Sequence, residues 1–206
     1  MPPLRIAVLA LFAFTVLTLV MAAPAYAQTP APAPAAPPQP PPCAAPEFRQ
    51  FDFWIGDWDL VSLTPGAGKD RWDTVPGTPT DHVEVMLAGC ALLQRWDDAP
   101  DAPPSNGPPL HGLSVSKWDP ALKKWRQVWV DNQGSWLVFT GEWKNGRMEL
   151  YTEPKETKGK SVVMRQVFAD ITPDTMKWSW ERSEDGGHSY VPVWKLDYKR
   201  RVPAKT

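Results

Sequence analysis

The sequence has few of the residues and motifs from which common metal and catalytic sites are built. It contains three histidines and two cysteines in 206 residues. His82, His111 and His188 have no partner at metal-ligand spacing, so we expect no metal site. There is no Gly-x-Ser-x-Gly elbow and no glycine-rich phosphate loop. A haem held by His111 is the one cofactor alternative, and we otherwise expect no cofactor.

Charge of one sign and long amphipathic helices are also scarce. The formal net charge is −1, from 22 Lys and Arg against 23 Asp and Glu, and no basic block occurs, so we expect no nucleic-acid partner. No amphipathic pattern extends beyond two helical turns, which argues against a helical domain. By contrast, the chain has 12 tryptophans and 25 prolines. The tryptophans favour aromatic packing or an aromatic pocket.

Residues 1–27 have the pattern of a secretory signal peptide. Arg5 supplies a positive charge, residues 6–23 form an apolar core, and Ala-Tyr-Ala at 25–27 is a small-x-small cleavage site. The apolar run of about 18 residues also suits a retained membrane anchor, but the position of the cleavage site favours removal. We therefore expect a periplasmic or secreted protein whose mature form does not span the membrane.

The rest of the chain divides into a linker and one folded domain. Residues 28–46 are rich in proline and alanine, a composition typical of extended polyproline II structure. Residues 47–206 remain, which is enough for one hydrophobic core. We predict a single domain there, and a monomer.

The two cysteines are Cys43, near the end of the linker, and Cys90. An even count in an oxidising compartment favours a disulfide, which would close a loop of roughly fifty residues and stabilise the fold by about 2–4 kcal/mol. The alternative is two unpaired thiols. A lipoprotein anchor at Cys43 fits poorly, because three prolines precede it.

Short segments that alternate apolar and polar residues follow one another from residue 58 onward. Asn145-Gly146 between two of them is a strong hairpin turn. The expected strands are 58–63, 81–87, 90–96, 110–118, 123–131, 135–143, 147–152, 161–170, 175–182 and 190–200. This spacing predicts an all-β antiparallel meander, either a sandwich or a barrel. We favour a barrel of about 8–10 strands, because closure leaves no exposed edges.

The densest aromatic run, residues 51–60, begins the folded domain. Phe48, Phe51, Trp54 and Ile55 have the spacing of a short helical turn with one apolar face. We predict that this turn plugs one end of the barrel. The chemistry is then expected at the opposite, open end, beneath a long loop at 64–80 that carries Trp72. The alternative is that Trp72 packs on the barrel rim.

Gly56-Asp57-Trp58 resembles the Gly-x-Trp motif of lipocalins and related calycin barrels. In that family the tryptophan lies across the closed end of the barrel and stacks on an arginine from the last strand. Arg200, or its neighbour Arg201, occupies the matching position here. The resemblance implies structural roles for Gly56, Trp58 and Arg200 in a calycin-like barrel.

A wider pattern resembles the exported bacterial proteins of the DUF1579 type, which are thought to be lipocalin-like. The matching segments are Phe-Asp-Phe-Trp-Ile-Gly-Asp-Trp-Asp at 51–59, Gly-Cys at 89–90, Trp-x-Gln-x-Trp-Val-Asp at 125–131, Ser-x-Asp-Gly-Gly at 183–187 and Tyr-x-Arg at 198–200. This resemblance implies a fold and no particular activity.

Residues 183–190 also resemble an Asp-box, Ser-x-Asp-x-Gly-x-x-aromatic. Asp185 is expected to bond backbone amides in a hairpin turn, Gly187 to take a special dihedral angle, and Tyr190 to pack beneath the turn. We interpret Asp185 and Gly187 as structural.

Three strand faces combine tryptophan with polar residues. Alternation places Trp125, Gln127, Trp129 and Asp131 on one face. A sealed core would not favour that face, because an unpartnered buried Gln or Asp costs about 1–3 kcal/mol. The second face holds Trp178, Trp180 and Arg182, and the third Trp136, Val138 and Thr140. The candidate ligand-binding residues are Trp72, Trp125, Gln127, Trp129, Asp131, Trp136, Trp178, Trp180 and Arg182.

These faces indicate an aromatic cavity with a few polar anchors. The alternative is that the tryptophans fill a closed barrel or support its strands from outside. A cavity predicts binding of a small apolar or aromatic molecule. A second hypothesis is an enzyme, a hydrolase or isomerase that uses Asp131 or another cavity carboxylate with a raised pKa. A third is a structural or protein-interaction domain with exposed tryptophans.

Overall fold

The structure is a computed structural model that describes residues 43–99 and 108–202. In these ranges the helical structure consists of three short 3₁₀ helices, η1 (Pro46–Arg49), η2 (Asp52–Trp54) and η3 (Leu87–Gly89). None of the described helices has the length and apolar character needed to cross a membrane. The predicted signal peptide, most of the linker and part of the proline-rich loop at 97–109 lie outside the described residues.

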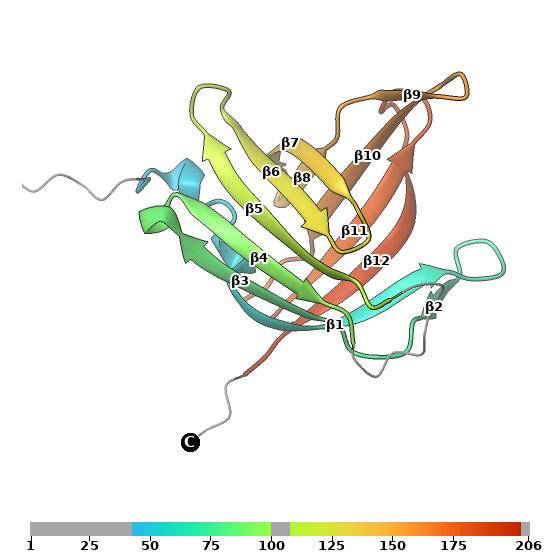
Figure 1. Cartoon of the computed structure of the whole chain (residues 1–206), viewed down its shortest axis with the longest axis horizontal. Helices are drawn as coiled ribbons and strands as arrows, with labels where there is room; N and C mark the ends of the chain where they lie inside the picture. Colours follow the sequence, from blue (N-terminus) through green and yellow to red (C-terminus); the bar gives the residue numbers. More distant parts are fainter. Residues whose placement is uncertain (1–42, 100–107, 203–206) are drawn as a thin grey trace, which may run out of the picture. The chain divides into compact units, whose positions relative to one another are not determined.

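The described chain is otherwise built from twelve antiparallel strands (Figure 1). They are β1 (Gly56–Pro65), β2 (Trp72–Thr74), β3 (Thr80–Met86), β4 (Ala91–Asp97), β5 (His111–Asp119), β6 (Lys124–Asp131), β7 (Trp136–Lys144), β8 (Arg147–Tyr151), β9 (Lys155–Thr157), β10 (Lys160–Ala169), β11 (Thr175–Ser183) and β12 (Val191–Arg200). Each predicted strand is present within two residues of its predicted bounds. The short strands β2 and β9 were not predicted.

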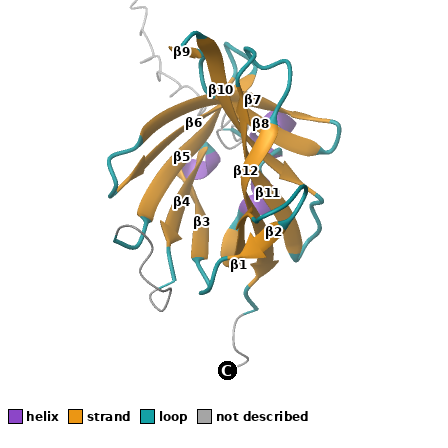
Figure 2. Ribbon diagram, turned by 90° about the vertical axis from the view of Figure 1, so that its right-hand side faces the viewer, coloured by secondary structure: helices purple, strands orange, loops and turns teal. Residues whose placement is uncertain are grey.

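The strands form a closed ring. Their order is β11-β12-β1-β3-β4-β5-β6-β7-β8-β10, and a further pairing of β10 with β11 completes the circle (Figure 2). Strands β2 and β9 pair only with β1 and β10 and stand outside this ring of ten. The prediction of an all-β antiparallel meander that closes into a barrel of about 8–10 strands is therefore confirmed.

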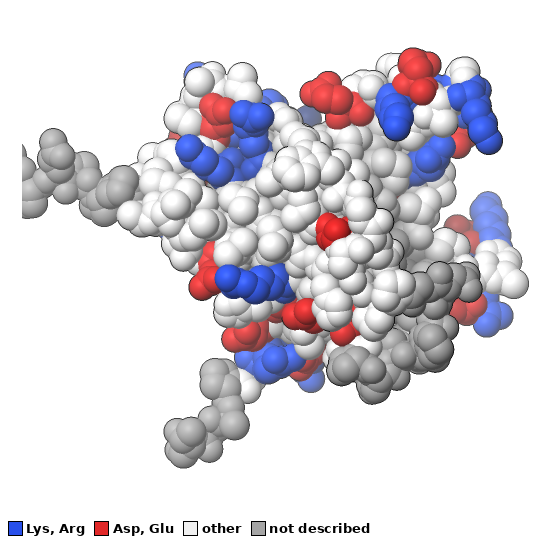
Figure 3. All heavy atoms as spheres, in the orientation of Figure 1, with Lys and Arg blue, Asp and Glu red and all other residues white. Residues whose placement is uncertain are grey.

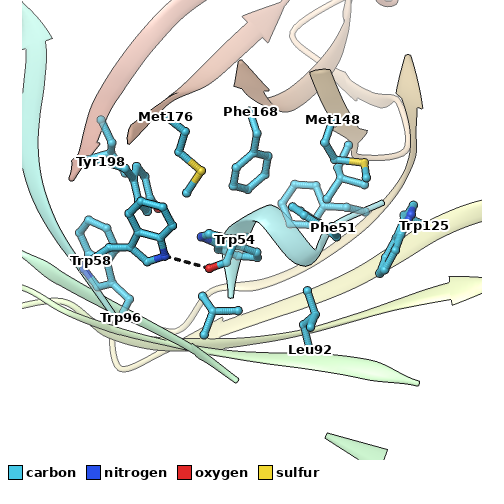
Figure 4. Close-up of a cluster of buried hydrophobic side chains, with 14 of the residues drawn as sticks. Phe51, Trp54, Trp58, Leu92, Trp96, Trp125, Met148, Phe168, Met176 and Tyr198 are labelled. Atoms are coloured by element: carbon cyan, nitrogen blue, oxygen red, sulfur yellow. Dashed lines mark hydrogen bonds between the residues drawn. The ribbon is translucent and has the colours of Figure 1, made fainter. Parts of the chain in front are cut away.

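The aromatic run before β1 closes one end of the barrel. Phe51 and Trp54 are buried inside the ring, where the Phe51 ring lies 5.3 Å from that of Trp125 and 5.0 Å from that of Phe168 (Figure 4). The turn is 3₁₀ rather than α-helical and is divided between η1 and η2. Its aromatic face fills the barrel end, as the sequence predicted.

Trp58 and Arg200 join this plug to the last strand. The guanidinium carbon of Arg200 lies 4.0 Å from the centre of the Trp58 ring, and the same side chain donates hydrogen bonds to the Ile55 carbonyl (2.6 Å) and the Phe53 carbonyl (3.2 Å). Gly56 has φ +126°, and a Cβ there would lie 2.4 Å from Arg200 Nη1. Only glycine therefore suits this position, and the contact implied by the Gly-x-Trp resemblance is present.

Cys43 and Cys90 form a disulfide, which confirms the predicted pairing. It ties the segment before η1 to η3, where Arg49 also donates a hydrogen bond to the Gly89 carbonyl. We expect the double substitution Cys43→Ser/Cys90→Ser to lower the free energy of unfolding by about 2–4 kcal/mol, because the bridge restricts the unfolded chain. Urea denaturation under oxidising conditions measures this difference, and equal midpoints for the two proteins would contradict it.

The segment after β11 adopts the predicted Asp-box turn. The Asp185 carboxylate accepts hydrogen bonds from Ser189 Oγ (2.6 Å), from the Ser189 amide (2.9 Å) and from the His188 amide (3.0 Å), and these bonds lower its pKa. Gly187 has φ +96°. The Tyr190 ring packs against Arg165, whose guanidinium carbon lies 3.9 Å from the ring centre. These contacts hold the turn against the outer wall of the barrel.

Candidate functional site

A cavity of about 270 Å³ occupies the barrel interior above the plug. Seven of its fifteen lining side chains are aromatic, and the remainder are aliphatic or uncharged polar groups with one carboxylate. The lining residues are Trp54, Gln94, Trp96, Leu110, Trp129, Asp131, Gln133, Ser135, Leu137, Gln166, Trp178, Trp180, Trp194, Leu196 and Tyr198.

Tryptophans from four strands form the cavity wall. They are Trp96 of β4, Trp129 of β6, Trp178 and Trp180 of β11, and Trp194 of β12. The rings of Trp178 and Trp180 are parallel, with centres 6.3 Å apart, and the Trp194 ring stands edge-on to Trp178 at 5.2 Å. Trp178 and Trp180 both point inward because side chains alternate along a strand. The wall is thus an aromatic surface held by the strand registers.

A row of buried polar side chains separates the cavity from part of the plug core. Gln166 Nε2 donates to Gln127 Oε1, and Gln127 Nε2 donates to Ser116 Oγ (2.8 Å). Trp178 Nε1 donates to Gln166 Oε1 (3.2 Å). The amide groups therefore bond mainly to one another, which removes the penalty of burying them unpaired.

Asp81 of β3 is a second buried polar centre, and the sequence did not single it out. It is 1% exposed, and its Oδ2 accepts hydrogen bonds from Gln94 Nε2 (3.1 Å), Tyr198 Oη (3.1 Å) and Trp54 Nε1 (3.2 Å). These three donors all line the cavity, so Asp81 lies directly behind the cavity floor. Its Oδ1 is buried without a partner in the described structure. Burial raises the pKa of Asp81 to about 8 despite the three hydrogen bonds.

This carboxyl group predicts a stability that depends on pH. Because the pKa of Asp81 is raised above its unfolded value of about 3.9, the folded state holds an extra proton between about pH 4 and pH 8, and its stability falls as the pH rises through that range. One fully retained proton corresponds to about 1.4 kcal/mol per pH unit. We expect Asp81→Asn to flatten this slope. Urea denaturation of both proteins at pH 5 and pH 8 measures it, and parallel slopes would contradict the prediction.

Asp131 stands at the end of β6, and the β6–β7 turn wraps around it. Its carboxylate accepts hydrogen bonds from Trp129 Nε1 (2.8 Å), the Gln133 amide (2.9 Å) and the Ser135 amide (2.9 Å). Burial acts to raise the pKa of Asp131, but these bonds outweigh it and leave the pKa lowered. The enzyme hypothesis expects a raised pKa at a cavity carboxylate, and the pKa of Asp131 is lowered instead. Its role here is to hold the turn.

Five of the predicted site residues lie in or directly beneath the cavity. Trp129, Asp131, Trp178 and Trp180 line it. Gln127 is buried just below and reaches the lining through its hydrogen bond with Gln166. The first predicted face therefore points into the barrel, and so does the tryptophan pair of the second face.

Two of the predicted tryptophans lie elsewhere. Trp125 belongs to the plug core, where it contacts Phe51. Trp136 is 73% exposed on the outer surface, so the prediction of a third interior face with Val138 and Thr140 is wrong. On β7 it is Leu137 and Phe139 that face inward. On β7 both the set that begins with Trp136 and the set that begins with Leu137 are apolar enough to be buried. Closure of the ring turns the set that begins with Leu137 inward.

Trp72 and Arg182 also lie away from the cavity. The Lys195 ammonium stands 4.0 Å above the Trp72 ring, on the outside of the barrel. Arg182 forms an ion pair with Glu184 at the start of the Asp-box turn. No residue between 64 and 80, all of which the structure describes, lines the cavity, so the prediction that this loop covers the site is wrong. Leu110 and the β6–β7 turn take that position.

The histidines lie on the outside of the barrel. His111 is paired with Asp97 (2.7 Å), His82 is paired with Asp57 (2.7 Å), and neither lines the cavity. The haem alternative for His111 therefore has no support in the geometry. Within residues 43–99 and 108–202, no group of three or more His, Cys, Asp or Glu side chains is arranged to hold a metal ion.

Comparison with known proteins adds little to this description. No protein-family model and no curated protein matches the chain. Among solved structures, the S-type phycobiliprotein lyase CpeS from Guillardia theta is 10% identical with a TM-score of 0.49, over 74% of this chain and 90% of that chain. A protein of unknown function from the DUF3598 family of Nostoc punctiforme is 8% identical with a TM-score of 0.24, over 76% of this chain and 100% of that chain. These similarities are too weak to carry an argument about function.

Proposed function

We propose that the protein binds a small, largely apolar aromatic molecule inside the barrel. The observation that carries this proposal is that six of the 12 tryptophans, together with Tyr198, line one cavity. Protein interiors are normally close-packed, and flat rings from five different elements leave a space of about 270 Å³ here. Ligand pockets typically measure about 300–1,000 Å³, so the expected ligand is at the small end of this range.

The polar groups of the lining agree with an apolar occupant. Four lining tryptophans donate their indole N–H to protein acceptors, namely Trp54 to Asp81, Trp129 to Asp131, Trp178 to Gln166 and Trp194 to Ser62. These four tryptophans therefore contact a molecule in the cavity through their ring surfaces rather than through their N–H groups. Aromatic faces bind other rings through stacked and edge-to-face contacts.

Fluorescence titration tests this proposal. The probe is 1-aminonaphthalene, a compact fluorophore whose emission depends on the polarity of its surroundings. We expect saturable binding of one probe per chain, quenching of tryptophan emission, and displacement of the probe by indane. The absence of saturable binding would overturn the proposal.

A second candidate function, docking of a protein partner, rests on the outer face of the barrel. Leu113, Val130 and Trp136 lie side by side on β5, β6 and β7, and Leu113 and Trp136 are exposed. Figure 3 shows a broad area over β5 and β6 with few charged side chains, in which one acidic group stands and around which most of the other charges lie. Exposed apolar patches of this kind are typical of interaction surfaces. Light scattering of the wild-type protein and of a Trp136→Asp variant tests whether two copies of the chain associate through this face. Self-association through this face predicts a larger mass for the wild type than for the variant, and a monomer predicts equal masses.

We also propose that the protein acts after export, in line with its resemblance to exported DUF1579-type proteins. The Cys43–Cys90 disulfide supports this, because such bonds persist in oxidising compartments. Mass spectrometry of the protein secreted by a bacterial host is expected to show a chain that begins at Gln28. A chain that retains residues 1–27 would contradict cleavage.

A further inference from the structure

Gly112 of β5 lies directly against the ring of Trp129, with no room between them for a side chain. A Cβ at Gly112 would lie 2.2 Å from Cζ2, 2.4 Å from Cη2 and 3.0 Å from Cε2 of Trp129. Carbon atoms in favourable contact lie about 3.5–4.0 Å apart. Gly112 does not have a positive φ, so its backbone conformation does not require glycine. A glycine inside a strand often marks a place where another group approaches closely, and at Gly112 that group is the indole ring.

A hydrogen bond to Asp131 holds the Trp129 ring in this position. The indole Nε1 donates to Asp131 Oδ2 (2.8 Å), and the Asp131 carboxylate also accepts hydrogen bonds from the Gln133 and Ser135 amides (both 2.9 Å). Asp131 and Gly112 are directly paired across the β5–β6 ladder, so Trp129 is the diagonal neighbour of Gly112 on the inward face. The β5 backbone lies behind the ring, and a displaced ring therefore moves toward the cavity.

Trp178 and Trp180 form the wall opposite Trp129. Strand β11 stands four places from β6 in the ring of ten strands, so the inward side chains of the two strands face one another across the interior. The rings of Trp178 and Trp180 are parallel. Below them, the hydrogen bond from Gln166 of β10 to Gln127 of β6 spans the interior. Planar rings thus bound the cavity on two sides, and a polar bridge bounds it underneath.

The cavity volume indicates how many rings the space can hold. A dry protein cavity of about 150 Å³ binds one benzene molecule, whereas this cavity measures about 270 Å³ and so has room for a second ring. We propose that the ligand is a flat molecule of two fused rings, and that Gly112 is the positioning residue that sets this limit by letting the Trp129 ring lie against β5. This inference rests on the proposed function and names the size class of the ligand.

Gly112→Ala tests this limit by making the cavity smaller. The added methyl group pushes the Trp129 ring inward, and one methylene of misfit in an apolar pocket is worth about 10–200-fold in specificity. We therefore expect the affinity for 1-aminonaphthalene to fall about tenfold or more, and the affinity for aniline, which has the same amine on one ring, to stay within about twofold. 1-Indanone and benzaldehyde repeat the comparison of two rings with one, with a carbonyl group in place of the amine.

Trp129→Phe changes the same wall in the opposite direction. Phenylalanine lacks the outer ring carbons Cζ2 and Cη2 that meet Gly112, so this variant has more room. We expect it to bind the three-ring 1-aminoanthracene, which the wild type excludes. The double variant Gly112→Ala/Trp129→Phe should regain the wild-type affinity for 1-aminonaphthalene, because the added methyl group then occupies the space that the indole has left.

The indole signal of Trp129 in ¹⁵N–¹H correlation spectra reports the position of the ring directly. Displacement of the ring by Gly112→Ala should weaken the hydrogen bond to Asp131 and move this signal to lower ¹H frequency. Trp129→Phe identifies the signal by its loss. Thermal unfolding of each variant shows whether it is folded.

The possible results distinguish this inference from the proposed function. If Gly112→Ala weakened binding of one-ring and two-ring probes equally, or of neither, the inference would be overturned and the apolar cavity would remain. Binding of 1-aminoanthracene to the wild type as tightly as 1-aminonaphthalene would also overturn it. If Gly112→Ala does not fold, Trp129→Phe decides alone, and its failure to bind 1-aminoanthracene contradicts the inference. Binding of none of these probes to the wild type would overturn the proposed function as well.

Discussion

Replacing Trp58 with alanine is expected to lower the free energy of unfolding by about 3–5 kcal/mol. Trp58 is almost fully buried, its N–H donates to the Trp54 carbonyl (2.8 Å), and Arg200 stacks on its ring. The substitution therefore leaves a large void and also removes the surface on which Arg200 rests. Because Arg200 bonds the carbonyls of Phe53 and Ile55, the plug should loosen as well. Urea denaturation followed by circular dichroism measures the loss.

Trp136→Ala is the matched control for this experiment. It is the same chemical change at a side chain that is 73% exposed, so its effect should stay within about 0.5 kcal/mol of zero. Trp58 does not line the cavity. We assign a structural role to the closed end of the barrel and ligand binding to the open half. If Trp58→Ala left stability unchanged but abolished ligand binding, this assignment would be wrong.

Replacing Trp180 with alanine is expected to weaken binding of 1-aminonaphthalene by about tenfold or more. Trp180 contributes one wall of the cavity, stacks parallel to Trp178, and meets Phe139 edge-on at 5.6 Å. Its loss removes aromatic contact area from the ligand and widens the cavity, and truncation of a central aromatic contact commonly costs 2 kcal/mol or more of binding free energy. The probe titration described above measures the change.

Trp72→Ala provides the comparison at a tryptophan outside the cavity. Trp72 packs against Lys195 on the outer surface, so its loss should leave the affinity for the probe unchanged. If both variants bound the probe with wild-type affinity, the ligand would not occupy this cavity. Thermal unfolding of each variant establishes that a loss of affinity does not follow from unfolding.

The strands and their order could be predicted well from the sequence, because local rules determine them. Two-residue alternation marks each strand, and turns such as Asn145-Gly146 limit its length; Asn145 and Gly146 both have positive φ. The aromatic plug was also predictable, since Phe51 and Trp54 are too apolar to remain exposed. Pairing of Cys43 with Cys90 followed from the count of two cysteines in a protein that we expect to be exported.

The binding site could be predicted only in part, because alternation shows which residues share a face but not which face is inside. Trp129, Trp178 and Trp180 were assigned to the interior, but Trp136 was assigned there as well and lies outside. Trp96 and Trp194 were not proposed as site residues, although each lies within a predicted strand. Their convergence depends on the order of strands around the closed ring, which brings β4 and β12 to the same cavity.

Asp81 was missed for a different reason. It shares the inward face of β3 with Val83, and the alternation of Asp81 and Val83 with His82 and Glu84 could have revealed a buried carboxyl. Three partners distant in sequence, Trp54, Gln94 and Tyr198, make that burial tolerable. Such a set of partners is visible only when the tertiary fold is known.

The central claim, that a small aromatic molecule binds within the barrel, is tested most directly by the indole signals of the 12 tryptophans in ¹⁵N–¹H correlation spectra during titration with 1-indanone. We predict that the signals of Trp54, Trp96, Trp129, Trp178, Trp180 and Trp194, which line the cavity, shift along one saturation curve. Those of Trp72 and Trp136, on the outer surface, should not move. Shifts confined to Trp136, or no saturable shift among the six cavity signals, would contradict the claim.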